Sequence, residues 1–180
     1  MQKGGRRNFV RRKRCYHKPK EKALPVCSNG RESFYNFIYS YATTAEAARR
    51  AAKEVIEAVK PYKLSYPIAF DIEYESIYTG GSKQVNTDIC KSFLDEIEAA
   101  GYYAMLYCSK DFLDTYLYPS QLTAYDKWIA QYASACTSKH AHGIWQYSST
   151  GRVDGIPGNI DRNLSYKDYP AILAGMKEAN

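Results

Sequence analysis

Residues 66–73, Tyr-Pro-Ile-Ala-Phe-Asp-Ile-Glu, form an apolar run that ends in two carboxylates. The run follows an alanine-rich segment that stops at Pro61, and a loop with two glycines comes after it. This pattern predicts a buried strand over residues 67–73. Because alternate side chains of a strand share one face, Asp71 and Glu73 are expected to point the same way, with Cβ atoms roughly 6–7 Å apart.

The pair Asp71 and Glu73 is the main candidate for chemistry. It lies at the carboxyl end of the predicted strand, where α/β folds place their active sites. Two carboxylates this close, in partly desolvated surroundings, raise the pKa of at least one, which places a proton donor beside an ionised group. Glycoside hydrolysis needs that division of roles. Two alternatives stay open: the acids could be solvated and have no role, or they could bind a metal. The lack of a nearby histidine counts against the metal-binding pair.

The rest of the chain alternates strand-like and helix-like segments. Further strands are expected over residues 34–42, 102–108, 127–132 and 143–147. Helices are expected over 43–60, 87–100 and 109–116 and after Pro170, with a loop over 148–166. Thr43 and Glu46 form a capping-box pattern, Gly101 is a plausible C-cap, and Ser109 can cap the short helix. Alternating strands and helices predict an α/β fold with parallel pairing, as an open sheet or a (β/α) barrel.

The positive net charge is a local feature of the N-terminal segment. Residues 1–31 hold eleven of the 25 lysines and arginines and a single acid, Glu21, whereas the remainder is net acidic. We expect two parts: a flexible basic segment over 1–31 and a catalytic domain over 32–180. A basic segment can bind nucleic acid or anionic wall polymers, or have no partner. Only charge supports nucleic-acid binding, which we consider the weaker interpretation.

Cysteine and histidine usage argues against disulfide and metal frameworks. The five cysteines are odd in number and widely spaced, so they predict neither a disulfide set nor a zinc site, and Cys90 and Cys108 are expected in the core. His140 and His142 form a loop pair without a third ligand, and we expect no metal and no cofactor. No apolar run reaches membrane-spanning length, and the basic start does not resemble a secretory signal.

Several motifs, taken together, resemble glycoside hydrolase family 25, the Chalaropsis-type lysozymes. In chain order they are Tyr39-Ser-Tyr-Ala-Thr-Thr, residues 66–73, Gly101-Tyr-Tyr-Ala-Met-Leu-Tyr, Trp128-Ile-Ala-Gln-Tyr, Gly143-Ile-Trp-Gln-Tyr-Ser-Ser and Val153-Asp-Gly-Ile-Pro-Gly-Asn-Ile-Asp-Arg-Asn. The resemblance covers roughly residues 33–176. It implies a TIM-like (β/α) barrel with fewer helices than usual. It also implies cleavage of the β-1,4 bond between N-acetylmuramic acid and N-acetylglucosamine in bacterial peptidoglycan.

The resemblance also assigns roles to residues. Glu73 matches the family's general acid, and Asp71 matches the carboxylate that stabilises the reacting sugar, as a nucleophile or by orienting the substrate's 2-acetamido group. We favour the second mechanism, because 5–5.5 Å, the separation that a direct nucleophile needs, is at the short end of the i, i+2 range. Asp161 matches a further acidic residue at the rim of the family's groove. Four aromatic residues sit on strand-like segments that match those lining the groove, and each taken alone could equally be a core residue: Tyr39, Tyr107, Trp128 and Trp145.

The sequence departs from the family at its N-terminal end. Family members begin with an Asp-x-Ser strand and a second strand, and neither motif is present here. The expected barrel is therefore incomplete and has two exposed edges. We expect poor activity, strand exchange between subunits in a homo-oligomer, or pairing of the N-terminal segment with an edge. The leading hypothesis is a muramidase that is released as phage lysozymes are and acts on the bacterial wall. The alternative is a non-catalytic remnant of a lysozyme that only binds the wall.

Overall fold

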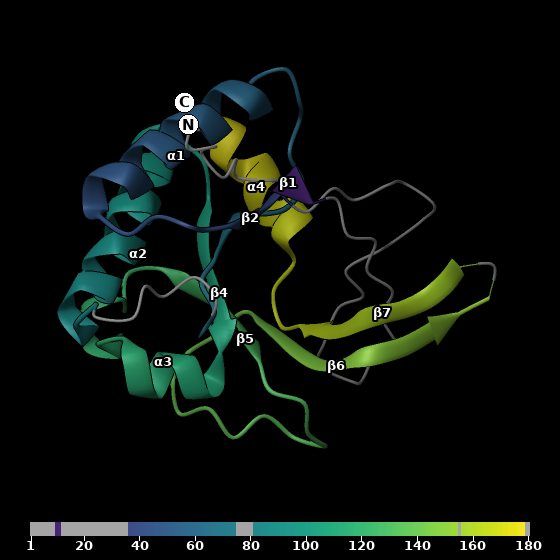
Figure 1. Ribbon diagram of the computed structural model, residues 1–180. Coiled ribbons are helices and arrows are strands. Elements are labelled where there is room, and N and C mark those ends of the chain that lie inside the picture. Colours follow the sequence, from purple (N-terminus) through teal and green to yellow (C-terminus); the bar gives the residue numbers. More distant parts are fainter. Residues whose placement is uncertain (1–9, 12–35, 75–80, 155, 179–180) are drawn as a thin grey trace, which may run out of the picture.

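The computed structural model describes residues 10–11, 36–74, 81–154 and 156–178 of the chain. Its strands are β1 (Val10–Arg11), β2 (Asn36–Tyr39), β3 (Ile68–Asp71), β4 (Ala104–Ser109), β5 (Asp126–Ala130), β6 (Ile144–Val153) and β7 (Ile156–Ser165). Its helices are α1 (Ala45–Val59), α2 (Lys83–Ala99), α3 (Lys110–Tyr116) and α4 (Tyr169–Glu178), with a 3-10 turn at Pro119–Gln121. Figure 1 shows their arrangement.

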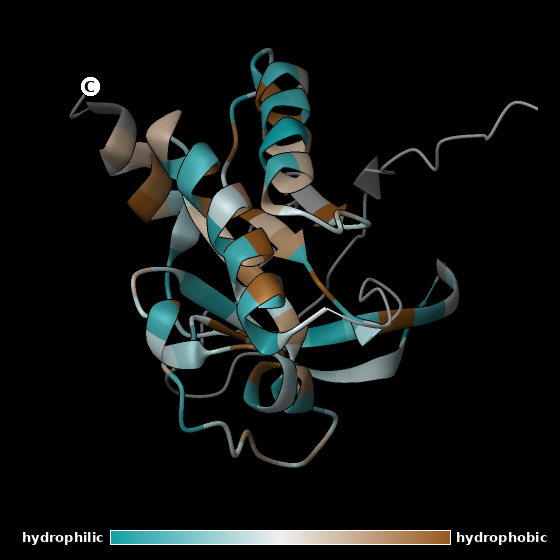
Figure 2. Cartoon of the chain, turned by 60° about the vertical axis from the view of Figure 1, so that its left-hand side comes forward, coloured by the Kyte–Doolittle hydropathy of each residue, from teal (hydrophilic) through white to brown (hydrophobic). Residues whose placement is uncertain are grey.

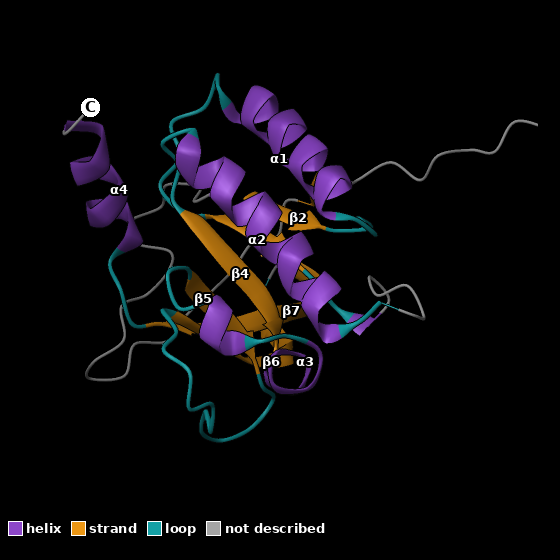
Figure 3. Ribbon diagram, turned by 90° about the vertical axis from the view of Figure 1, so that its left-hand side faces the viewer, coloured by secondary structure: helices purple, strands orange, loops and turns teal. Residues whose placement is uncertain are grey.

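One sheet carries all the described strands in the order of the sequence, β1 to β7. Strands β2 to β6 run parallel, whereas β1 pairs with β2 and β7 pairs with β6 in antiparallel fashion. The parallel strands curl, α1 and α2 cover the convex side of the sheet, and β6 and β7 project from the body as a long hairpin (Figures 1 and 3). The predicted α/β class with parallel pairing is confirmed.

The barrel is incomplete in the part of the chain that the structure describes. Within those residues no pairing joins β1 to β7, so the sheet is a curled half-barrel with two ends. At one end Val10 and Arg11 pair with Ile38 and Phe37 of β2. Pairing of the basic N-terminal segment with this edge is one of the three possibilities that the sequence suggested.

The outer face of the sheet packs against the helices and forms the main core. Phe70 of β3 stacks on Phe93 of α2 with ring centroids 4.4 Å apart, and both side chains are fully buried. Burying a side chain of this size stabilises the fold by about 1.5–3 kcal/mol. Cys90 and Cys108 are also fully buried here, as expected. In Figure 2, which is coloured by hydropathy, hydrophobic segments appear on both the helices and the strands.

Two of the three predicted cap positions are confirmed, and one is wrong. Ser109 is the N-cap of α3 and accepts a 3.0 Å hydrogen bond from the amide of Phe112. Gly101 follows α2 with φ 81°, a left-handed conformation that glycine adopts without strain. The N-cap of α1 is Thr44 and not Thr43, because the Thr44 hydroxyl accepts from the amide of Ala47 at 3.1 Å. α2 begins at Lys83, four residues before the predicted start at Thr87.

The prediction of a loop over residues 148–166 is wrong. Most of that segment belongs to the hairpin of β6 and β7, which pairs from Ile144 and Ser165 to Val153 and Ile156. Three register irregularities interrupt the pairing. The hairpin carries polar residues on exposed faces, so its sequence lacks the apolar alternation of a half-buried strand.

Candidate active site

Four residues of the candidate site lie in one row across the carboxyl-terminal halves of the parallel strands. The pairing register places Tyr39 of β2 beside Asp71 of β3, Asp71 beside Tyr107 of β4, and Tyr107 beside Trp128 of β5. Residues paired in register point to the same face of a sheet, so the four side chains share the inner, concave side of the half-barrel. The structure therefore brings together residues that are up to 89 positions apart in the sequence.

Tyr107 is the buried centre of this row. Its ring meets the indole of Trp128 edge-on with centroids 5.4 Å apart, and its hydroxyl donates a 2.7 Å hydrogen bond to Oε1 of Gln146. Burial raises the pKa of Tyr107 far above its ordinary value, and the negative charges of Glu73, Asp71 and Asp161 add to the increase. The three predicted acids thus converge on one tyrosine.

Asp71 and Glu73 occupy different environments. Asp71 ends β3 and is 2% exposed, whereas Glu73 is only partly buried and follows the strand. The strand is therefore shorter than the predicted 67–73, although the amide of Ile72 still bonds the Tyr107 carbonyl at 3.1 Å. One carboxylate lies within the protein and the other faces a pocket, which is the asymmetry that an acid and its partner need.

The pocket beside Glu73 has a volume of about 340 Å³. Its lining combines the end of β4, the start of α3 and the segment after β5, and consists of Glu73, Tyr107, Ser109, Lys110, Asp111, Ala130, Gln131 and Tyr132. Carboxylate, ammonium, amide and phenol groups thus surround one small space. That lining suits a polar ligand with many hydroxyl and amide groups.

Two buried side-chain amides accept hydrogen bonds from the row, and neither was predicted from the sequence. Gln146 of β6 accepts hydrogen bonds from Tyr107 and, at 3.2 Å, from Tyr132. Asn163 of β7 accepts a 2.8 Å hydrogen bond from Nε1 of Trp128. The two amides are register partners, and both are almost fully buried. Both amides lie inside the motifs that resemble family 25. For Asn163 the sequence also held a signal, because a residue two positions after Asp161 on a strand shares its face.

The structure does not bring Trp145 together with the other predicted groove residues. Trp145 precedes Gln146 on β6 and so points to the opposite face of the sheet. There its Nε1 donates to the Gln131 carbonyl at 2.8 Å, and its ring packs on Leu164 and Tyr147. Trp145 also lines a second, wider hollow of about 790 Å³ under the segment from Ser134 to His142.

The remaining predicted residues lie at the margins of the row. Asp161 is half-buried on β7 and shares its face with Asn163. Tyr39 is half-buried at the end of β2, with its ring centroid 5.0 Å from that of Tyr41. Neither Asp161 nor Tyr39 lines the pocket beside Glu73.

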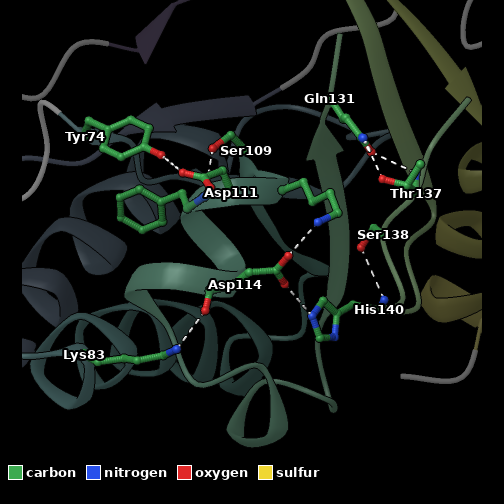
Figure 4. Close-up of polar contacts among 11 residues, drawn as sticks. Tyr74, Lys83, Ser109, Asp111, Asp114, Gln131, Thr137, Ser138 and His140 are labelled. Carbon is green, nitrogen blue, oxygen red and sulfur yellow. Dashed lines mark hydrogen bonds and ion pairs between the residues drawn. The ribbon is translucent and has the colours of Figure 1, made fainter. Parts of the chain in front are cut away.

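The two loop histidines belong to a network of polar contacts beside the pocket. His140 Nε2 lies 2.9 Å from Oδ1 of Asp114 (Figure 4). Nζ of Lys110 lies 2.8 Å from Oδ2 of the same carboxylate. Burial tends to raise the pKa of Asp114, but the hydrogen bonds from Lys110 and His140 lower it below its ordinary value. Among the described residues, no three His, Cys, Asp or Glu side chains form a group that could hold a metal ion.

The curled α/β half-barrel thus carries acids and aromatic residues on one face, near the carboxyl ends of its parallel strands. Residues 27–156 match the sequence profile of glycosyl hydrolases family 25. The chain belongs to that family. It is also 24% identical over 145 residues to the uncharacterized protein YegX of Escherichia coli O157:H7, covering 78% of this chain and 52% of the relative. The chain therefore spans about half the length of that curated relative.

Solved structures of lytic proteins share the fold. The modular autolysin LytC from Streptococcus pneumoniae is similar with a TM-score of 0.62 and 29% identity, over 72% of this chain and 33% of LytC. The modular Cpl-1 endolysin, solved as a variant in complex with a peptidoglycan analogue, is similar with a TM-score of 0.57 and 25% identity, over 74% of this chain and 39% of the endolysin. The catalytic domain of an endolysin from bacteriophage P40 of Listeria monocytogenes matches in fold, with a TM-score of 0.60 and 20% identity, over 77% of this chain and 70% of that domain.

The helices of the described residues are too short or too polar to cross a membrane.

Proposed function

We propose that this protein hydrolyses bacterial peptidoglycan as an N-acetylmuramidase, cleaving the β-1,4 bond between N-acetylmuramic acid and N-acetylglucosamine. The observation that carries the proposal is the pair of acids at the end of β3: Asp71 is buried in the row, and Glu73 lines the pocket. Membership of family 25 supports it, as do the similarities to an autolysin and to an endolysin that was solved with a peptidoglycan analogue.

In this mechanism Glu73 is the general acid. It donates a proton to the glycosidic oxygen while the bond from that oxygen to the anomeric carbon breaks. Glu73 then removes a proton from the water that attacks the same carbon. Its position in the pocket, on the edge of the buried row, leaves room for both the sugar and the water.

Asp71 stabilises the positive charge that develops on the reacting sugar. We favour a substrate-assisted reaction, in which the 2-acetamido oxygen attacks the anomeric carbon and Asp71 orients that group and holds its proton. Water then opens the resulting ring, and the configuration at the anomeric carbon is retained. Burial of Asp71 supports this role, because a carboxylate removed from water interacts more strongly with a nearby charge.

Of the aromatic residues of the row, the half-buried Tyr39 would bind the glycan chain, and the buried Tyr107 and Trp128 would shape the surface beside it. Tyr39, Tyr107 and Trp128 line one face of the half-barrel, with Asp161 at its rim. Aromatic rings pack on the apolar faces of sugars, and phenol hydroxyls bond their polar edges. Tyr132, which is 60% exposed and bonded to Gln146, extends this surface toward the pocket.

A second candidate is a wall-binding protein with impaired catalysis. The open half-barrel in the described part of the chain favours it, because a groove with one wall fewer holds its sugar less firmly.

Under both candidate functions the partner is bacterial peptidoglycan and the site of action is the cell wall. Residues 32–180 would form the wall-active domain, residues 1–31 a separate basic segment, and a second copy of the chain could cover an open edge of the sheet. Nucleic-acid binding rests on charge alone.

The identity of the new reducing end tests the proposal. Purified walls are digested with the protein, reduced with borohydride, hydrolysed and analysed for amino-sugar alcohols. A muramidase yields muramicitol, whereas a glucosaminidase yields glucosaminitol. Release of muramicitol supports the proposal. If neither alcohol forms but the protein sediments with the walls, the chain is a binding protein.

A further inference from the structure

The backbone that carries Glu73 is not held by the sheet alone. β3 ends at Asp71, so Glu73 and Tyr74 lie beyond the strand. A general acid must stay within about 2.6–3.2 Å of the oxygen that it protonates. Contacts that restrain the segment after β3 therefore bear on this requirement.

Tyr74 makes that contact with α3. Its hydroxyl donates a hydrogen bond to Oδ2 of Asp111. Its ring meets Phe112 and Tyr116 edge-on, with centroids 5.6 Å and 5.5 Å away. Figure 4 shows the Tyr74 side chain reaching toward Asp111 from a segment far away in the sequence. Tyr74 is nevertheless 48% exposed, so burial in the core does not explain its position.

The partner side of the contact is firmly placed. α3 follows β4 directly, Ser109 caps it, and Phe112 is fully buried. Asp111 lies in the first turn of α3 and lines the same pocket as Glu73. The hydrogen bond to Asp111 raises the pKa of Tyr74, which keeps its hydroxyl protonated as the donor. The contact thus ties the segment after β3 to the helix that forms the opposite wall of the pocket.

We propose that Tyr74 and Asp111 are positioning residues that hold Glu73 at the pocket. This inference rests on the proposed role of Glu73 as general acid. The hydrogen bond fixes the residue next to Glu73, and the ring contacts fix the direction in which the chain leaves the strand. Displacing a catalytic group by about 1 Å can lower a rate about 100-fold, so a modest loosening of this segment affects catalysis before it affects folding.

The test compares variants in wall hydrolysis. Tyr74→Phe removes the hydroxyl and keeps the ring, Asp111→Ala removes the acceptor, and Asp111→Asn retains one. Tyr62→Phe is the matched control, because Tyr62 is an exposed tyrosine in the turn before β3, at the far end of the strand. We expect Tyr74→Phe and Asp111→Ala each to lower kcat about tenfold, with KM within about twofold of the wild type. We expect Asp111→Asn to recover part of the loss.

The double variant decides whether the two residues act together. If they position Glu73 through one contact, Tyr74→Phe combined with Asp111→Ala loses no more activity than either single variant. If the losses multiply, or if KM alone rises, Asp111 and Tyr74 act separately on the substrate and the proposal is wrong. Unchanged kcat in Tyr74→Phe also overturns it.

A second measurement is independent of the proposed function. Amide hydrogen exchange over Ile72 to Tyr74 is expected to be faster in Tyr74→Phe than in the wild type or in Tyr62→Phe. Equal exchange rates would overturn the tether even in an inactive protein. If the wild type releases no reducing ends but exchange accelerates as expected, the proposed function fails and the tether stands.

Discussion

The hydroxyl of Tyr107 donates a buried hydrogen bond of 2.7 Å to Oε1 of Gln146 and so links the fourth strand of the sheet to the sixth. The bond crosses the inner face of the half-barrel beneath the proposed sugar-binding row. It therefore joins the stability of the curled sheet to the shape of the candidate site.

Tyr107→Phe is expected to lower both the stability of the fold and the hydrolytic activity. Losing one partner of a buried hydrogen bond costs about 1–3 kcal/mol, and each kcal/mol lowers Tm by roughly 2–4 °C in a domain of this size. Thermal unfolding measures the first effect and release of reducing ends the second. Tyr62→Phe, an exposed tyrosine, serves as control. Equal Tm values for Tyr107→Phe and wild type would mean that the bond does not stabilise the sheet.

Gly143→Ala is expected to lower the free energy of unfolding, because it disrupts the contact between α4 and β5. A Cβ at this position would lie 1.7 Å from the Tyr169 hydroxyl and 2.7 Å from Oδ2 of Asp126, which are hydrogen-bonded to each other at 2.7 Å. This contact attaches α4 to β5. Overpacking of this kind costs about 1–3 kcal/mol, and loss of the buried bond adds to it.

The matched control for Gly143→Ala is Gly175→Ala, within α4. A Cβ there meets no atom within 4 Å, and alanine favours a helix over glycine by about 1 kcal/mol. Urea unfolding should therefore show a lower free energy of unfolding for Gly143→Ala and a slightly higher one for Gly175→Ala. Equal effects of the two substitutions would contradict the contact at Gly143.

Acid is expected to destabilise the fold through Asp126. Burial alone raises the pKa of this carboxyl, but hydrogen bonds from Lys167 at 2.8 Å and from Tyr169 lower it below its ordinary value. A group whose folded-state pKa is depressed stabilises the fold above its unfolded pKa of about 3.9 and loses that contribution as pH falls through the folded value.

Asp126→Asn tests this dependence by urea unfolding between pH 7 and pH 2. The variant should be less stable than the wild type at pH 7, and the difference should shrink below about pH 4. A difference that stays constant over the whole range would exclude Asp126 as a source of the acid sensitivity.

Only one of the two tryptophans should change its fluorescence when a ligand binds. The chain has only Trp128, in the row, and Trp145, on the other face of the sheet. In Trp145→Phe the remaining indole is that of Trp128 in the row, so a muropeptide bound beside the row should change its fluorescence. In Trp128→Phe the response should be lost, with hydrolysis reduced at least tenfold. A response carried by Trp145 instead would place the groove on the outer face.

The sequence pointed to the members of the row through their motifs: Asp71 by its place at the end of an apolar strand, and Tyr39, Tyr107 and Trp128 by the resemblance to family 25. The register of β2 to β5 places all four side by side. The sequence did not show on which face of the sheet Trp145 lies, because β6 places Trp145 and Gln146 on opposite faces, and only the pairing with β5 decides which one points inward. It failed at the hairpin because polar residues form strands there through pairing rather than through apolar burial. Thr43 and Thr44 have equal capping propensity, and only the structure shows which hydroxyl meets an amide.

The most direct test of the central claim is clearing of purified bacterial walls by the wild type, Glu73→Gln and the control Glu54→Gln, an exposed glutamate of α1. Removing a general acid typically costs about 10²–10⁴ in rate. We predict that the wild type and Glu54→Gln clear the walls, whereas Glu73→Gln folds and sediments with them but clears them at least about 100-fold more slowly. Clearing by Glu73→Gln at the wild-type rate would contradict its role as the acid, and a folded wild type that leaves the walls intact would contradict the proposed activity.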